Sequence, residues 1–274
     1  MRSHYLKHNF IFQNHHKLTK TFHENQQKSN FYCLSFYFCL YVNGQDARFT
    51  QKNPDKPDAT EYMDPEIKVI TSGTVPSDAI VLFDGKNLDQ WESTKDGGTA
   101  KWKLEDGAMT IVAGTGGIST KKHFADCQLH IEWRSPIEGD EKKGQGKGNS
   151  GVFLQGIYEV QVLNSYNNRT YRNGQAGSIY KQSPPLVNIT SKMGDWNVYD
   201  IIYSAPKFTI NGGVASPPYI TVIHNGVVVQ NHTMIQGVTN YIGQPTNPVH
   251  GKAPIHLQDH SNAVSFRNIW IREL

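Results

Sequence analysis

The sequence predicts an all-β protein, a sandwich or barrel of many short strands. Its 274 residues include 24 Gly, 13 Tyr, 12 Phe and 5 Trp, a composition typical of short strands and frequent turns. From Ile80 onward, apolar and polar residues alternate with a period of two between Gly- and Asn-containing turns, and no segment reads as a convincing amphipathic helix. The absence of a repeat of fixed period argues against a propeller.

The N-terminal segment has the layout of a signal peptide. Basic residues precede an apolar run, Phe31 to Val42, which is shorter than the ~20 residues that cross a bilayer, and Asn43-Gly44 follows as a small, polar exit. We therefore expect residues 1–44 to be a signal peptide with a long basic region, and the protein to be periplasmic or extracellular. The alternative is a disordered tail with an apolar patch. Residues 45–74 are polar and Pro-bearing, which predicts a linker before a domain spanning 75–274.

The charge balance and the cysteines exclude several classes of function. The net charge is +3, but residues 1–44 hold five basic residues and one acid, which leaves 22 basic and 23 acidic residues beyond them. We therefore expect no nucleic-acid partner. No Gly-rich dinucleotide fingerprint opens a helix, so no nucleotide cofactor is expected. Cys127 is the single cysteine after residue 44, which excludes an intrachain disulfide or a cysteine-based metal site there.

Several strands follow from alternation and turn chemistry. Glu105-Asp106-Gly107 separates two short strand-like segments, and Asn225-Gly226 is the strongest short hairpin signal in the chain. The predicted strands, in chain order, cover residues 102–104, 108–112, 128–134, 196–203, 219–224, 227–230 and 264–271.

Residues 149–165 form the most informative stretch. They read as two strands with a tight link at Gly156-Ile157, and alternation places Phe153, Gln155, Glu159 and Gln161 on one sheet face, opposite an aliphatic face. An aromatic ring, two amides and a carboxylate suit a sugar, because the ring packs against its C–H face and the polar groups bond its hydroxyls. The alternative is an ordinary solvated sheet face.

An ordered set of phrases resembles one family. The phrases are Leu82-Phe83-Asp84-Gly85-Lys86-Asn87-Leu88, Gly148-Asn149-Ser150-Gly151-Val152-Phe153-Leu154, Tyr158-Glu159-Val160-Gln161-Val162-Leu163, Gly177-Ser178-Ile179-Tyr180, Trp196-Asn197-Val198-Tyr199-Asp200, His224-Asn225-Gly226, Leu257-Gln258-Asp259-His260 and Phe266-Arg267-Asn268-Ile269-Trp270-Ile271. Over Ile80 to Leu274 the chain resembles the 3-keto-disaccharide hydrolase family, also described as 3-keto-glucoside 1,2-lyase and 3-keto-2-hydroxyglucal hydratase. The resemblance implies a concanavalin/glucanase-like jelly-roll β-sandwich of two antiparallel sheets and an exported carbohydrate-active protein.

The strand from Tyr158 to Leu163 carries one acid, and this limits the reactions that the protein could catalyse. Ordinary glycosidases flank the scissile bond with two carboxylates, whereas the strand offers Glu159, then Gln161 and Leu163; a second acid would have to be Glu132 or Asp259. A 3-keto sugar removes this need, because its ketone acidifies the C2 proton, an enolate forms, the group at C1 leaves and water can add back. Such a reaction needs a base, a group that stabilises the enolate oxygen and an acid.

The sequence offers candidate residues for each of these roles. The candidate catalytic bases are Glu159, His260 and Lys181, with Arg134 or one divalent metal ion stabilising the enolate. The candidate metal ligands are Glu159, His232, Asp259 and His260, although no spacing fixes such a site. The candidate substrate-binding residues are Glu132, Arg134, Phe153, Gln155, Gln161, His256 and Gln258.

Plainer roles stand beside some of these assignments. Lys181 and His232 would by default be solvent-exposed, and Glu132 and Arg134 would pair with neighbouring strands. The predicted function is cleavage of 3-keto-glycosides by hydrolysis, or by elimination followed by hydration. The alternatives are a non-catalytic carbohydrate-binding module on the same scaffold and an ordinary endo-glycosidase.

Overall fold

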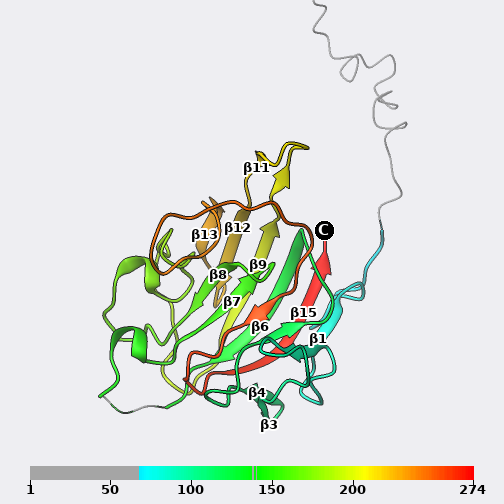
Figure 1. Cartoon of the computed structure of the whole chain (residues 1–274). Helices are drawn as coiled ribbons and strands as arrows, with labels where there is room; N and C mark the ends of the chain where they lie inside the picture. Colours follow the sequence, from blue (N-terminus) through cyan, green and yellow to red (C-terminus); the bar gives the residue numbers. More distant parts are fainter. Residues whose placement is uncertain (1–67, 138, 140) are drawn as a thin grey trace, which may run out of the picture. The chain divides into compact units, whose positions relative to one another are not determined.

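The computed structural model describes residues 68–137, 139 and 141–274. The expected signal peptide, 1–44, and most of the expected linker lie outside the described residues. Lys68–Leu274 forms one compact unit, drawn in colour in Figure 1. Within the described part of the chain, no helix is long and apolar enough to cross a membrane.

Two antiparallel sheets make up the unit. The larger, eight-stranded sheet runs β13-β12-β9-β6-β15-β4-β3, and β1 also pairs with β15. Its strands are β1 (Ile80–Phe83), β3 (Lys103–Glu105), β4 (Ala108–Thr110), β6 (Cys127–Arg134), β9 (Asn197–Ser204), β12 (Tyr219–His224), β13 (Val227–Met234) and β15 (Ser265–Glu273). The five-stranded sheet runs β2-β5-β14-β7-β8, with β2 (Trp91–Ser93), β5 (Ile118–Thr120), β14 (His256–Leu257), β7 (Ser150–Leu154) and β8 (Tyr158–Val162). A separate pair joins β10 (Lys207–Phe208) to β11 (Val214–Ser216).

The predicted all-β fold and its hairpins are confirmed. Asn225 and Gly226 turn β12 into β13 with φ of 50° and 79°, and Asp106 and Gly107 turn β3 into β4 with φ of 52° and 70°. Two successive left-handed residues are the backbone of a type I′ turn, which matches the twist of the strands it joins. The strands β2, β5 and β14, of two or three residues each, were not predicted.

The core lies between the two sheets. Leu129, Ile131 and Trp133 of β6 point into it, as do Val152 and Val160 of β7 and β8, and all five side chains are buried. In Figure 1, β7 and β8 cross in front of β6, β9 and β12. This inward packing turns the alternate residues of β7 and β8 to the outer face of the smaller sheet.

A buried hydrogen bond also ties the two sheets together. The Tyr199 hydroxyl on β9 donates to the backbone oxygen of Gln161 on β8 at 2.8 Å. Both groups are shielded from water, and the same oxygen also accepts a hydrogen bond from the backbone N–H of Gly177 at 3.0 Å. The bond therefore fixes β8, and with it Glu159 and Gln161, relative to the larger sheet.

Candidate active site

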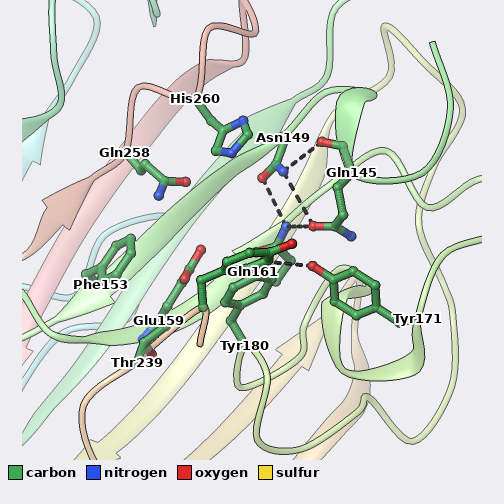
Figure 2. A pocket seen from close by; sticks show the side chains of 11 residues that line it. Gln145, Asn149, Phe153, Glu159, Gln161, Tyr171, Tyr180, Thr239, Gln258 and His260 are labelled. Atoms are coloured by element: carbon green, nitrogen blue, oxygen red, sulfur yellow. Dashed lines mark hydrogen bonds between the residues drawn. The ribbon is translucent and has the colours of Figure 1, made fainter. Parts of the chain in front are cut away.

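A cavity of about 480 Å³ opens on the outer face of the five-stranded sheet. Strands β7 and β8 form its floor, and its walls come from the loops around residues 145–149, 171–180, 239–241 and 258–260. Figure 2 shows the side chains converging on it. The lining residues are Gln145, Asn149, Phe153, Glu159, Gln161, Tyr171, Tyr180, Thr239, Tyr241, Gln258 and His260.

Glu159 is the single Asp or Glu among these lining residues. Its side chain is 4% exposed, and the described part of the chain provides its carboxylate with no hydrogen bond or ion pair. Burial raises the pKa of Glu159 to about 8, because a carboxylate without partners is costly in a poorly solvated place. Such a group can take a proton near neutral pH.

The position of this carboxylate depends on a glycine. Gly151 pairs with Gln161 on the neighbouring strand, and a Cβ atom built on it would lie 2.5 Å from Oε1 of Glu159. The carboxylate therefore lies against bare backbone of β7. Behind it, the backbone N–H of Glu159 donates to Oγ1 of Thr239 at 3.0 Å, which joins the loop that carries Tyr241 to the strand.

An amide network forms the wall next to Glu159. Nδ2 of Asn149 donates to the backbone oxygen of Gln145 at 2.8 Å, which turns Oδ1 of Asn149 toward Gln161. Nε2 of Gln161 donates to that oxygen at 3.0 Å and to Oε1 of Gln145 at 3.3 Å. The backbone oxygen of Gln145 thereby fixes the orientation of the Asn149 amide, and Oδ1 of Asn149 in turn fixes that of Gln161, so the wall is ordered and uncharged.

Two tyrosines form the adjoining wall, next to Gln145. The hydroxyls of Tyr171 and Tyr180 are 2.7 Å apart and hydrogen-bonded, as Figure 2 shows. Nζ of Lys181 lies 4.3 Å from the ring centre of Tyr171 and 4.8 Å from that of Tyr241. The cavity thus combines one buried carboxylate, neutral amides and a pair of phenols, and the ammonium group of Lys181 lies against the ring of one of these phenols, Tyr171.

The structure brings together five of the predicted site residues, namely Phe153, Glu159, Gln161, Gln258 and His260, which all line the cavity. Lys181 contacts the cavity through the tyrosine rings on which its ammonium group lies. His256 lies next to Phe153 in an edge-to-face contact with ring centres 5.0 Å apart. Burial lowers the pKa of His256 to about 4, so this ring is neutral at physiological pH.

The lining residues that the sequence pattern did not identify all lie outside the strands. Tyr180 and Asn149 occur in phrases that carried the family resemblance, which was the one available signal for them. Nothing in the sequence set Gln145, Tyr171 or Tyr241 apart from ordinary loop residues. Loop side chains have no periodicity from which a direction can be inferred.

Gln155 does not face the cavity as predicted. It follows the last residue of β7 and has a left-handed φ of 48°, which ends the alternation of the strand. Its side chain points into the core, where Oε1 accepts a hydrogen bond from the Tyr203 hydroxyl at 2.6 Å and Nε2 donates to the Gly251 oxygen at 2.9 Å. The prediction that it belongs to the polar face was wrong, and the contacts are structural.

Glu132 and Arg134 also lie elsewhere. Both point outward from β6 in the larger sheet, on the side away from the core. Glu132 accepts hydrogen bonds from Arg267 at 2.6 Å and from Asn268 at 2.7 Å. The guanidinium of Arg134 lies 4.7 Å from the ring centre of Trp196. Alternation along β6 gave their face correctly, but this face belongs to the other sheet.

The four predicted metal ligands are not brought together. His232 is on edge strand β13, stacked on Tyr219 with ring centres 4.4 Å apart. Asp259 accepts hydrogen bonds from the backbone N–H groups of Gly116 and Ser261 at 3.0 and 2.9 Å, which closes its loop. Over residues 68–137, 139 and 141–274, no three His, Cys, Asp or Glu side chains form a group that could hold a metal ion.

The comparisons with known proteins indicate that this sandwich, with a cavity on its outer face, belongs to a carbohydrate-active class of protein. Residues 78–272 match the model of the 3-keto-α-glucoside-1,2-lyase-like domain. The chain belongs to this family, which confirms the resemblance found in the sequence. A search of curated proteins found no match.

Solved structures agree with this assignment. A "putative glycosyl hydrolase" from Parabacteroides distasonis ATCC 8503, solved at 2.13 Å, is 54% identical, with a TM-score of 0.75, covering 80% of this chain and 97% of that one. Two further proteins of the same description and organism, at 1.70 and 2.00 Å, share 19% and 22% identity with TM-scores of 0.52 and 0.51. Each match covers 72% of this chain, and 94% and 99% of the respective relatives. At this identity the latter two show the fold alone.

Proposed function

We propose that the protein cleaves glycosides already oxidised to a ketone at C3, by elimination across C1 and C2 that water addition can follow. The observation that carries this proposal is the isolation of Glu159: it is the one carboxylate lining the cavity, it is buried, and it has no partner among the described residues. Family membership supports the same substrate class.

A single carboxylate suits this reaction better than ordinary glycoside hydrolysis. Hydrolysis by either common route uses two carboxyl groups about 5–10 Å apart across the scissile bond. The other two acids considered, Glu132 and Asp259, are engaged by Arg267 and Asn268 and by backbone N–H groups. Neither lines the cavity.

The elimination needs one proton removed from carbon. The Glu159 carboxylate takes the C2 proton, and the electron pair moves onto the ketone oxygen at C3 as an enolate. When the ketone re-forms, the double bond shifts to C1–C2 and the C1 oxygen leaves with its electron pair, to be protonated. Addition of water to C1 and return of a proton to C2 then give the free 3-keto sugar.

The enolate oxygen needs a donor, and Gln258 and His260 line the same cavity as Glu159. Oriented donors that meet developing charge in a poorly solvated site stabilise it strongly. Figure 2 shows both side chains on the same side of the cavity, above Glu159. We assign them to the ketone end of the sugar, and Phe153 to contact with its C–H face.

Two expectations from the sequence belong to the same proposal. Export would place the enzyme where glycans are degraded, and N-terminal sequencing of the protein recovered from the producing cells tests it; an intact N-terminus would contradict cleavage near Gly44. A divalent metal ion would find Glu159 and His260 in the cavity and would need its other ligands from substrate and water. Comparing activity with and without EDTA tests that part.

The decisive experiment uses a glucoside and its 3-keto derivative in deuterium oxide. We expect cleavage of the 3-keto substrate alone, with deuterium at C2 of the released sugar above the spontaneous exchange measured without enzyme. A product that is not deuterated at C2 would indicate direct displacement at C1. Equal or faster cleavage of the unoxidised glucoside would return the protein to the ordinary glycosidases, and binding of either without turnover would indicate a carbohydrate-binding module.

A further inference from the structure

We propose that Tyr171 is the general acid that protonates the leaving oxygen at C1, with Tyr180 and Lys181 as positioning residues behind it. This inference rests on the proposed elimination, which needs a proton donor at the leaving group as well as a base at C2. It concerns the wall of the cavity formed by the loop residues that the sequence pattern did not single out. It also changes the role of Lys181, which the sequence suggested as a base.

The first observation is the hydroxyl pair itself. Tyr171 and Tyr180 both line the cavity that contains Glu159, and their oxygens are 2.7 Å apart. The Tyr171 side is the more open of the two, since this residue is 36% exposed whereas Tyr180 is only partly exposed. If Tyr180 donates to Tyr171, the Tyr171 hydroxyl keeps its own proton available for a ligand.

The second observation is the position of Lys181. Its ammonium group lies 4.3 Å from the centre of the Tyr171 ring, so a phenolate formed there would face a positive charge. Its backbone has a left-handed φ of 64° and donates to the Asn173 oxygen at 2.8 Å. A non-glycine residue held in this region is uncommon and indicates a constraint imposed by its surroundings.

The third observation is how tightly the Tyr171 ring is placed. Tyr171 precedes the short 3₁₀ turn Arg172–Gly174, and a Cβ atom on Gly174 would lie 2.2 Å from Cε2 of the ring. Only a residue without a side chain allows the ring to lie there. Such close packing holds the hydroxyl in one direction, as a proton donor to a bound substrate requires.

The electrostatics agree with the same assignment. Burial is the largest cause that raises the pKa of both hydroxyls, and the Glu159 charge raises them further, so both are protonated at neutral pH. The hydrogen bond between them lowers the pKa of Tyr171 and raises that of Tyr180. Of the two, Tyr171 therefore gives up its proton first, and Tyr180 donates to the phenolate that results.

The proton balance of the step is complete. The C1–O bond breaks with its electron pair on oxygen, and the Tyr171 O–H bond breaks to form the new O–H bond of the leaving alcohol. Glu159 then holds the proton from C2, and Tyr171 is a phenolate that Tyr180 and Lys181 stabilise. Addition of water to the double bond runs in the opposite sense: Tyr171 takes a proton from water, and Glu159 returns one to C2.

The test compares Tyr171→Phe with wild type on two 3-keto-glucosides, one with a sugar as leaving group and one with nitrophenol. We expect cleavage of the sugar derivative to fall by about 100-fold or more, in the usual range for loss of a general acid. Cleavage of the nitrophenyl derivative should stay within about 10-fold of wild type, because nitrophenolate leaves without protonation. In deuterium oxide, the variant should still exchange the C2 proton of the uncleaved sugar derivative.

Tyr166→Phe is the matched control, because Tyr166 is an exposed tyrosine in a loop and does not line the cavity. It should cleave both substrates at close to the wild-type rate. Tyr180→Phe should slow the sugar derivative by about 10-fold, and the nitrophenyl derivative much less, because it removes one hydrogen bond to the phenolate. This variant keeps the proposal testable if Tyr171→Phe does not fold.

The outcomes separate this proposal from the one on which it rests. Equal losses on both leaving groups, or loss of C2 exchange together with cleavage in folded Tyr171→Phe, would overturn the assignment of Tyr171 and leave the elimination standing. A similar loss in Tyr166→Phe would also overturn it. Failure of the wild-type protein to cleave or exchange any 3-keto-glucoside would overturn the proposed function, and this assignment with it.

Discussion

Glu159 and Glu132 occupy matching places on opposite outer faces of the sandwich, yet their surroundings differ completely. Each projects outward from a strand whose alternate residues fill the core. Glu132 accepts hydrogen bonds from Arg267 and Asn268, and although burial raises its pKa, these partners outweigh burial and lower it. Glu159 has no such partner, and burial raises its pKa to about 8.

This difference indicates which of the two outer faces contains the catalytic group. A carboxylate that its neighbours already stabilise has little tendency to take a proton, whereas an isolated, buried one gains from it. Tight local pairing therefore marks Glu132 as a structural residue of the larger sheet. The absence of such pairing among the described residues marks Glu159 as the group that awaits a ligand or a proton.

The most direct test of the difference between Glu159 and Glu132 is to neutralise each carboxylate in turn. Glu159→Gln keeps the shape and should lower turnover by at least ~1,000-fold, because the base is lost. Glu132→Gln should change turnover by less than about threefold and cost about 1 kcal/mol of stability through the weakened pair with Arg267. Steady-state kinetics and urea unfolding of both variants give the answer; comparable kinetic losses would mean that the working face is misassigned.

The next effect concerns the space that Glu159 occupies. Gly151→Ala places a methyl group where the carboxylate and the Phe153 ring now lie, at 2.5 and 2.8 Å from their nearest atoms. We expect the end of the Glu159 side chain to shift and turnover to fall by about 10- to 100-fold, with little loss of stability. Gly146→Ala is the control, since a Cβ there meets nothing within 4 Å. Equal activities would show that this contact does not position the base.

The same contrast shows why sequence patterns identified part of the site. Alternation along β7 and β8 placed Phe153, Glu159 and Gln161 on one face, because inward packing of Val152 and Val160 leaves no other direction. The pattern failed for Gln155, one residue beyond β7, where a left-handed backbone reverses the side chain. Period-two alternation predicts the direction of a side chain only as far as the strand continues to pair with its neighbours.

Alternation also cannot say which sheet a strand joins. Glu132 and Arg134 were correctly placed on an outward face of β6, but this strand lies between β9 and β15 in the larger sheet. The loop residues Tyr171 and Tyr241 reach the cavity through tertiary packing over long sequence distances, which local patterns do not encode. The fold was therefore predictable in its class and hairpins, and the site in its floor and in the wall residues Gln258 and His260.

A smaller effect should appear in the pH dependence. As a base, Glu159 must be ionised, so kcat/KM should rise with pH and level off above about 8. Folding raises the pKa of this group from 4.5 to about 8. The wild-type free energy of unfolding should therefore fall as the pH rises from about 4.5 through about 8, whereas that of Glu159→Gln should not show this loss.

Between about pH 7 and pH 9 the difference between the two proteins should change by about 1 kcal/mol in favour of the variant. Buried His224 and His256, with pKa values lowered to about 4, remain neutral in this window and do not obscure it. Urea unfolding at both pH values measures the effect. Parallel stability curves for the two proteins would show that the Glu159 pKa is not raised.

The smallest kinetic effect is expected on the core side of the same strands. Tyr203→Phe removes the hydroxyl that donates to Oε1 of Gln155 at 2.6 Å and leaves that oxygen buried without this donor. The cost should be about 1–3 kcal/mol in the free energy of unfolding, with kcat unchanged, since neither residue lines the cavity. Tyr203→Phe combined with Gln155→Leu should recover part of this loss, because the unpaired oxygen is removed as well. A fall in kcat that exceeds threefold in folded Tyr203→Phe would mean that the core side of β7 positions Glu159, and that the two faces of this sheet are coupled rather than independent.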